Sequence, residues 1–519
     1  MKKILSSTAV LVLAACMGLG SCTGNFEEYN TNGETPGYGN VDPSTLLEQL
    51  ISTGAYYIYE RSWRVNNELM QYTVDCSASG RHQRYIFQAA DFGTPWDRFQ
   101  RYAANADHMI ALGRKYEDVN AMAIAMTLKA VFVSLLADLY GDIPYREAYR
   151  IEEGISQPAI DPQSEVYHAL IELLLEANDL YITTKDSNGS YTDPLAVPGK
   201  DLLYGGDIAA WRKLTNSLCL RLCLRLSNRP EAETAGIMQQ IVADPVKYPI
   251  FTSTADDAKV AYTNVVPFRN PFGDMTDASF TTSSHKCAAF FIDQLNSTSD
   301  PRMAQWVKIV SADDIHGVES GVVEPDGTGA CVMNVSVLKQ YTTPVWLMTS
   351  SEVWFILCEA AQKNMIPGGE AAAESYYEQA VACSIRQWNP SISDANIDRF
   401  LHAEGSKAAY DGTLERVILQ KWVSLFMQGF ESWCDYRRTG YPQLPIGPGT
   451  DNDGILPTRL GYGQMLISTN GSNYQKQVAR MKAAYPHVGK DGKRNGGDNM
   501  LTPVWWSKRA VELETGATN

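Results

Sequence analysis

The chain has 519 residues, of which 45% are hydrophobic and 10% aromatic, so it can bury one large core or two ordinary ones. Its formal net charge is −15, and it contains no long basic run. This composition argues against nucleic-acid binding, because contacts with phosphates require clustered Lys and Arg.

The N-terminus has the features of a lipoprotein signal peptide. Lys2 and Lys3 precede a short apolar run that ends in the sequence LGSC at Cys22. This order predicts a signal peptide over residues 1–21 and a lipid on Cys22. Cys16, at the end of LAAC, is a competing site, and ordinary secretion with a free Cys22 is the alternative to lipid attachment. A polar tether, residues 22–42, would then leave the rest of the chain peripheral to a membrane.

Hydrophobic periodicity next predicts a series of helices from residue 43 onward. The segment from Asp118 to Tyr145 is the most apolar, with Gly141 and Pro144 as stop signals, and we expect it to be a buried central helix. A membrane span is the alternative, which Lys129 in the middle of the segment disfavours. The other predicted helices are 43–74, 96–114, 163–181, one opened by Gly205–Asp207, 231–242, 346–363, 370–388 and 413–437.

Two regions lack this periodicity. Residues 244–343 contain short alternating pieces, QWVKIVS and GACVMNVS, which predict a few β-hairpins. Residues 439–519 are rich in Gly and Pro and read as an irregular tail. The expected architecture is therefore all-α, one domain over 43–519, with a scaffold of helical hairpins in 43–243 and 344–438 and a long insertion between them.

The hairpin near residue 370 has a repeat-like pattern. Ala373, Tyr377 and Ala380 alternate small and aromatic side chains at spacings of four and three. Such spacing lets antiparallel helices approach closely, as in tetratricopeptide repeats.

The sequence has no recognisable catalytic or metal-binding motif: HExxH, G-x-S-x-G, a Walker loop and paired CxxC are all missing. Its acidic residues in apolar helices are interpreted as partly buried ion pairs or helix caps; these are Glu352, Glu359, Glu415, Glu431 and Asp435. TDNDG at Thr450–Gly454 could hold a cation, but it lacks the spaced ligands of a calcium loop, so a simple turn is the favoured interpretation. We therefore expect neither a metal nor a cofactor, and a binding protein instead of an enzyme.

Aromatic side chains in irregular segments are the candidates for a ligand site, since sugars present C–H faces that pack on rings. Each could instead anchor its own loop, and for each taken alone that is the favoured interpretation. The candidates in or beside the first loop, residues 75–95, are Arg81, Tyr85, Phe87 and Trp96; those in the insertion are Tyr262, Phe268, Phe272 and Trp306.

Several blocks of the chain resemble the SusD/RagB family of Bacteroidetes outer-membrane lipoproteins, in the starch-binding-associating subgroup. The blocks occur in the family's order and are NFEEYNTN, ADLYGDIPYREAY, EVYHALIELLLEA, YGGDIAAWRKLTNSLCLRLCLRLS, SSEVWFILCEAA with YYEQAV, and QKWVSLFMQGFESWCDYRRTGYP. Of the family's functional residues, only the lipid-bearing Cys22 transfers to this sequence.

The resemblance implies a scaffold of four tetratricopeptide-like units at the cell surface. It also implies capture of oligosaccharides, or in some members peptides, and their delivery to a SusC-like TonB-dependent transporter that the N-terminal hairpins would meet. Two other hypotheses remain: a surface glycoside hydrolase with an acid pair, and a structural repeat protein that only docks partners.

Overall fold

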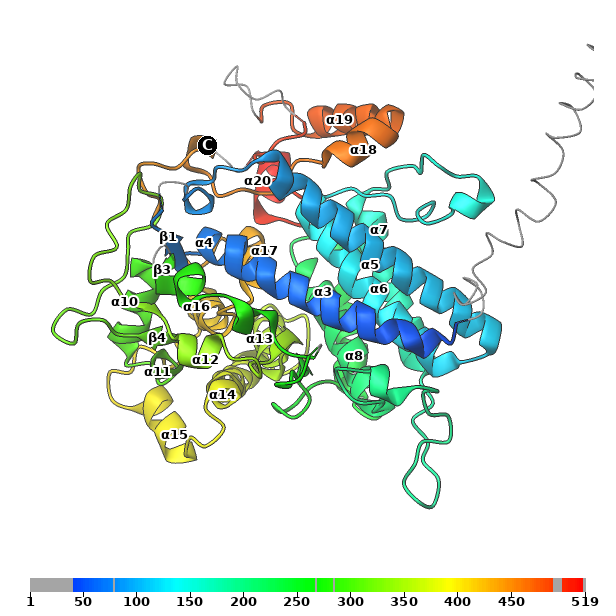
Figure 1. Ribbon diagram of the computed structural model, residues 1–519, viewed down its shortest axis with the longest axis horizontal. Coiled ribbons are helices and arrows are strands. Elements are labelled where there is room, and N and C mark those ends of the chain that lie inside the picture. Colours follow the sequence, from blue (N-terminus) through cyan, green and yellow to red (C-terminus); the bar gives the residue numbers. More distant parts are fainter. Residues whose placement is uncertain (1–40, 78–79, 267, 283–284, 489–496, 517–519) are drawn as a thin grey trace, which may run out of the picture. The chain divides into compact units, whose positions relative to one another are not determined.

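Three consecutive helices pack side by side in the N-terminal half: α5 (Ala89–Tyr116), α6 (Val119–Tyr140) and α7 (Gln163–Leu180) (Figure 1). The computed structural model describes residues 41–77, 80–266, 268–282, 285–488 and 497–516. The predicted signal peptide, Cys22 with its alternative Cys16, and nearly all of the tether lie outside these ranges. Residues Pro43–Asn519 form one compact unit.

The central helix α6 is buried on almost every face. The Asp118 side chain accepts a hydrogen bond from the Ala121 N–H at 2.8 Å, and Gly141, at φ 81°, ends the helix. Among the described residues it is the one helix long and apolar enough to span a membrane, yet 78% of its most apolar window is buried inside the protein. Lys129 bonds Asp107 at 2.5 Å. The prediction of a buried central helix is confirmed, although it ends at Tyr140.

The C-terminal half of the scaffold is built from α13 (Ser350–Gln362), α14 (Gly369–Trp388), α16 (Leu414–Ser424) and α17 (Gly429–Thr439), and α8 (Ile208–Arg225) contacts both halves. Ala373, Tyr377 and Ala380 are fully buried, and the Tyr377 ring lies 6.1 Å from that of Phe355 on α13. The small–aromatic–small pattern therefore does mark a close helix pair.

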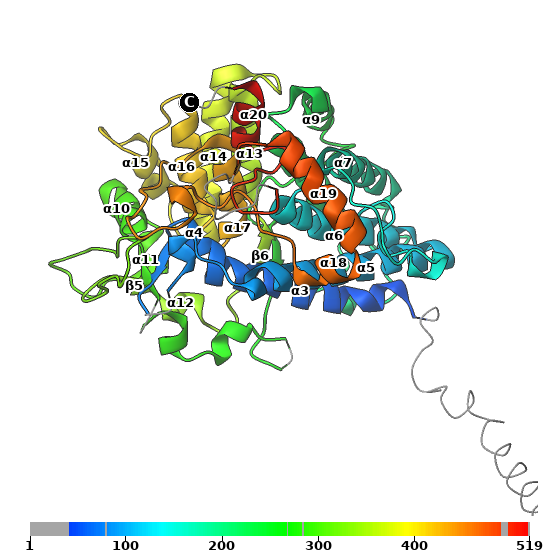
Figure 2. The ribbon, with the colours of Figure 1, turned by 90° about the horizontal axis from the view of Figure 1, so that it is seen from above.

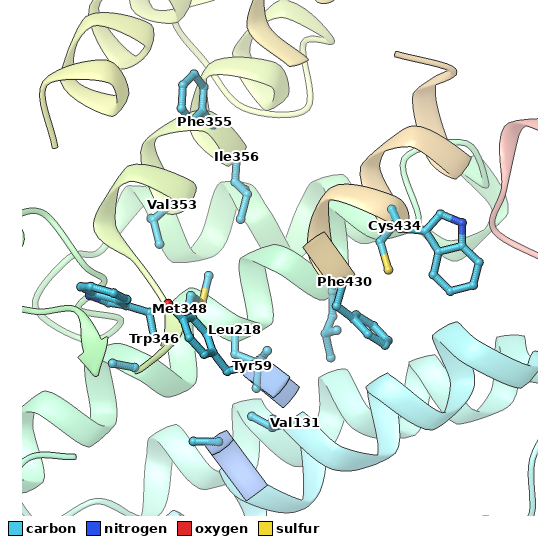
Figure 3. Packing of buried hydrophobic residues seen from close by; sticks show 14 of the residues in the cluster. Tyr59, Val131, Leu218, Trp346, Met348, Val353, Phe355, Ile356, Phe430 and Cys434 are labelled. Atoms are coloured by element: carbon cyan, nitrogen blue, oxygen red, sulfur yellow. The ribbon is translucent and has the colours of Figure 1, made fainter. Parts of the chain in front are cut away.

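One hydrophobic core joins these elements (Figure 3). Its side chains include Tyr59 from α3 (Leu47–Arg61), Val131 from α6, Leu218 from α8, Trp346 from β6 (Val345–Met348) and Phe430 from α17. The all-α prediction is confirmed, because the strands among the described residues are only two to four residues long and helices form the rest of the scaffold. The other helices are α3 (Leu47–Arg61), α4 (Asn67–Leu69), α9 (Thr234–Ala243), α10 (Ala289–Thr298), α11 (Met303–Trp306), α12 (Val335–Leu338), α15 (Asp394–His402), α18 (Gln464–Thr469), α19 (Gly471–Ala484) and α20 (Lys508–Thr515).

The described residues form three two-stranded antiparallel sheets, of which two tie the insertion to the scaffold and one lies within the insertion. They pair β1 (Thr73–Asp75) with β3 (His285–Cys287), β2 (Ala258–Val260) with β6 (Val345–Met348), and β4 (Val307–Lys308) with β5 (Val332–Met333). The two alternating segments of the insertion thus pair with each other, across a long connection. Single 3-10 or π turns fill the connections: Pro43–Leu46, Ser62–Asn66, His82–Arg84, Ile151–Glu153, Pro198–Lys200, Pro230–Ala232, Pro271–Asp274, Ala278–Thr282 and Asn452–Gly454.

Several predicted boundaries are wrong for identifiable reasons. The first helix ends at Leu69, because residues 73–75 pair with β3. The next helix begins at Ala89, seven residues before the predicted start, because Gln88 and Asp91 form a capping box that outweighs the Pro95 inside it. Residues 345–348 form a strand, and Thr349 then caps α13 through the Glu352 N–H at 3.2 Å.

The last scaffold helix and the tail also differ from prediction. Residues 413–437 form two helices, broken at residues 425–428, where Met427 has φ 66°. The tail is not purely irregular, since it contains α18, α19 and α20. α18 and α19 are seen in Figure 2, and Arg480 Nη2 on α19 donates to Asp142 Oδ2, two residues after the end of α6, at 2.8 Å.

Candidate functional site

The pairing of β1 with β3 brings the first loop against the insertion (Figure 1). Asp75 lies opposite His285 in this register. The Cys287 N–H bonds the Cys331 carbonyl at 2.9 Å, and a Cβ on Gly327 would lie 3.0 Å from Cys76 Sγ. Two segments that the sequence nominated separately are therefore neighbours.

The C-terminal tail lies along the same loop. Arg84 Nε donates to the Gly449 carbonyl at 3.0 Å, and the Arg84 carbonyl accepts from the Asp451 N–H at 2.8 Å. Asp451 also caps the turn Asn452–Gly454, so the predicted simple turn at TDNDG is confirmed. The first loop is thus held from both sides, which limits its freedom to rearrange.

Where this loop enters the first turn of α5, a polar pair lies beside two stacked rings. Arg81 bonds both carboxylate oxygens of Asp91, with Nη2–Oδ1 at 3.4 Å, and His82 Nε2 lies 3.3 Å from Asp91 Oδ1. The half-buried rings of Phe87 and Phe92 are nearly parallel, at 5.9 Å and 10°. We call Arg81, His82, Phe87, Asp91 and Phe92 the first-loop site.

The electrostatics of the site keep Asp91 ionised. Burial alone would raise the pKa of this carboxyl group, but hydrogen bonds from His82, from the Gln88 N–H and from Arg81 hold the pKa well below its usual range. The site therefore offers a fixed carboxylate and a fixed guanidinium next to an apolar ring face. Such a combination can bind a ligand with both hydroxyl groups and C–H surfaces.

Four of the nominated aromatics are buried, so the prediction of exposed loop rings is wrong for them. Tyr85 and Trp96 are 2% and 4% exposed, and Phe272 and Trp306 are fully buried. Trp96 lies 5.0 Å from the Tyr140 ring. Each of these four rings anchors its own segment in the core, which is the alternative that the sequence favoured for each ring taken alone.

Two nominated rings of the insertion, Tyr262 and Phe268, are half-buried. Beside them, Arg269 bonds Asp274 at 2.6 Å and stacks 4.6 Å above the Tyr341 ring. The sequence analysis missed Tyr341, which sits beyond the hairpin segments. The close approach of Gly273, where a Cβ would lie 2.2 Å from the Tyr341 ring, could not be read from the sequence.

A buried group connects the first-loop site with the insertion. Glu68 on α4 lies between two histidines, with Oε2 3.8 Å from His82 Nδ1 and Oε1 3.6 Å from His285 Nε2. The His285 ring packs 5.3 Å from Trp63, which also contacts Phe272. No local spacing signals this group, because its members come from α4, the first loop and β3.

Four of the five predicted acids of the apolar helices are in buried ion pairs, whereas Glu415, in the first turn of α16, is exposed and belongs to no ion pair of the described residues. Glu352 bonds Arg221 at 2.5 Å, Glu431 bonds Arg225 at 2.6 Å, and Arg438 bridges Glu359 and Asp435. Arg221, Arg225 and Glu431 line an internal cavity of about 40 Å³, which is too small for a sugar. These acids therefore do not form the open carboxylate pair that a glycosidase needs.

Comparison with known proteins now adds a family. The profile of the SusD-like family, described as starch-binding associating with outer membrane, matches residues 37–463. The chain belongs to the SusD-like family. A comparison with curated protein sequences finds no match.

Solved structures of SusD homologues share the fold. One from Bacteroides fragilis has a TM-score of 0.74 at 20% identity, covering 90% of this chain and 99% of its own. A chitin-binding protein has 0.71 at 24%, covering 90% and 99%. A chitin-binding SusD homologue from Flavobacterium johnsoniae has 0.71 at 19%, covering 89% and 97%. At these identities the SusD-like neighbours establish the architecture alone.

Proposed function

We propose that this SusD-like protein binds oligosaccharides at the cell surface and delivers them to a SusC-like TonB-dependent transporter of the outer membrane. The observation that carries the proposal is the first-loop site, in which the Phe87 and Phe92 rings lie beside the Arg81–Asp91 pair. A sugar ring would stack on Phe87 while its hydroxyls bond the guanidinium and the carboxylate. The family's description as starch-binding agrees with this role.

Binding without turnover fits the side chains at hand. The buried acids of the apolar scaffold helices are neutralised by Arg and Lys, and Asp91 is held ionised, so it cannot act as a general acid. A peptide ligand is the alternative within the same architecture, because the Arg81 guanidinium could equally donate hydrogen bonds to a peptide carboxylate. Glycoside hydrolysis is a less favoured alternative.

Calorimetry of the purified protein against malto- and chito-oligosaccharides and against short peptides tests this function. We expect binding to one glycan class, and we expect Phe87→Ala to weaken it at least tenfold, about 1.4 kcal/mol. Tyr376→Ala is the matched control, since Tyr376 is also half-buried and stacks on Trp354, at 5.6 Å, far along the chain on α14. Peptide binding without glycan binding would select the alternative, and release of shorter sugars would contradict the proposal.

The membrane anchor and the partner need separate tests. Cys22→Ser should release the protein from the outer membrane into the soluble fraction, whereas Cys16→Ser should not.

The wild-type protein, but not a Cys22→Ser variant, should co-purify with a β-barrel transporter from detergent extracts. Membrane retention of the Cys22→Ser variant would overturn the assignment of the lipid.

A further inference from the structure

The carboxylate of Glu68 is buried without a permanent positive charge beside it. Glu68 is 2% exposed, and the backbone N–H of Gln83 lies 3.3 Å from Oε2. Among the described residues its ion-pair partners are His82 and His285, which carry charge only when protonated. A buried carboxylate is costly unless a cation balances it.

A second carboxylate lies close to the first. Asp75 and His285 face each other across the β1–β3 pair, so their side chains project from the same face of the ribbon. One donor atom each from Glu68, Asp75 and His285 lie within 4.8 Å of one another. Two carboxylates at this separation repel, and a divalent cation between them would remove both penalties.

Two unpaired oxygens border the same group. Gln83 is 1% exposed and links the two acids, since its N–H approaches Glu68 and its Nε2 bonds the Asp75 carbonyl at 2.9 Å; its side-chain oxygen Oε1 has no hydrogen-bond partner. Thr73 Oγ1 is likewise buried and without a partner, and Thr73 lies on the same strand face as Asp75. Buried oxygens without partners are rare, and both are of the type that ligates cations.

The geometry points to a divalent-cation site formed by Glu68, Asp75 and His285, with Gln83 Oε1 as a further oxygen donor. The histidine nitrogen selects Zn²⁺ or Mn²⁺ over Ca²⁺ and Mg²⁺, which prefer oxygen ligands alone. Bonds of about 2.0–2.2 Å require the three side chains to draw together by roughly 1 Å. The ion would crosslink α4, β1 and β3, and its ligand Glu68 also contacts His82 of the first-loop site.

The site is tested by metal binding alone and does not depend on any sugar. The purified protein is stripped with a chelator, and Zn²⁺, Mn²⁺, Ca²⁺ and Mg²⁺ are titrated separately by calorimetry, with thermal melting in parallel. We expect one Zn²⁺ or Mn²⁺ per chain and a rise in melting temperature on binding. Asp75→Asn and Glu68→Gln should each weaken binding at least tenfold.

His402→Ala is the control for nonspecific zinc binding. His402 is an exposed histidine between Glu378 and Asp398, at 2.9 Å from each. This variant should keep the high-affinity ion. Circular dichroism checks the fold, and if Glu68→Gln does not fold, Asp75→Asn and His285→Gln carry the test. Failure to bind Zn²⁺ or Mn²⁺, or binding that survives both Asp75→Asn and His285→Gln, would overturn the site.

Discussion

The buried carboxylates of this chain differ in how their charge is balanced. Burial would raise the pKa of Glu359, but Arg438 and Lys363 outweigh it and hold the pKa far below the usual range. Asp257 forms no ion pair within the described part of the chain, and Lys259 lowers its pKa only slightly. Burial raises its pKa to about 7, and hydrogen bonds from Ser350, at the start of α13, offset this only partly. Two acids with similar burial therefore respond oppositely to pH.

Replacing Asp257 with Asn should stabilise the protein at high pH. The folded-state pKa of about 7 exceeds the ordinary aspartate pKa of 3.8, so between these values the folded state holds more protons than the unfolded state. The stability contributed by this group is present below about pH 4 and is lost as the pH rises through 7. The advantage of Asp257→Asn should grow over that range, to about 4 kcal/mol at most. Urea denaturation at pH 5 and pH 8 measures it, and a pH-independent difference would refute the assignment.

At the scale of elements, close approach of helices depends on small residues at the crossing points. Gly54 in α3 lies directly over Phe132 in α6, where an added Cβ would be 2.6 Å from the ring. Phe132 is 1% exposed and belongs to the core. The ring cannot move aside without disturbing that packing, so the glycine is required by tertiary contact and not by backbone conformation.

Gly54→Ala should therefore destabilise the protein, although alanine is the better helix former. Overpacking costs about 1–3 kcal/mol, against a propensity gain of about 1 kcal/mol. Gly236→Ala in α9 is the matched control, because nothing lies within 4 Å of its added Cβ. It should be neutral or stabilising by up to about 1 kcal/mol. Denaturant midpoints compare the two, and equal effects would show that the α3–α6 contact is looser than described.

At the scale of the whole molecule, the C-terminal tail completes the scaffold. Trp506 is fully buried, with the guanidinium groups of Arg225 and Arg437 at 5.3 and 4.8 Å from its ring. The Leu460 N–H bonds the Leu139 carbonyl at 2.7 Å, so the tail is also hydrogen-bonded to the end of α6. Residues of the C-terminal tail thus complete a core whose other side chains come from helices much earlier in the sequence.

Trp506→Ala should cost about 3–5 kcal/mol, because it leaves a large cavity beside two buried guanidinium groups. Trp505→Ala provides the comparison: this neighbouring ring is half-buried and stacks on Arg229 at 5.2 Å. Its loss should cost less than about 2 kcal/mol. Thermal melts of both variants test the difference, and similar melting temperatures would mean that the tail does not support the core.

The sequence by itself determined the central helix and most of the scaffold, because a long apolar run between Asp118 and Gly141 has few alternatives to a buried helix. It also indicated the ion pairs, since charges within apolar helices need partners. Of the first-loop site it gave Arg81 and Phe87, which lie in a segment without helical period.

Tertiary structure decided which residues of that loop face outward. Tyr85 and Phe87 are two positions apart, yet one ring is buried and the other half-exposed, because burial depends on what covers a loop and not on its own pattern. The tertiary structure also brings Glu68, Asp75 and His285 together. These side chains meet only because β1 pairs with β3, and a contact between segments so far apart in the sequence produces no periodic pattern in it.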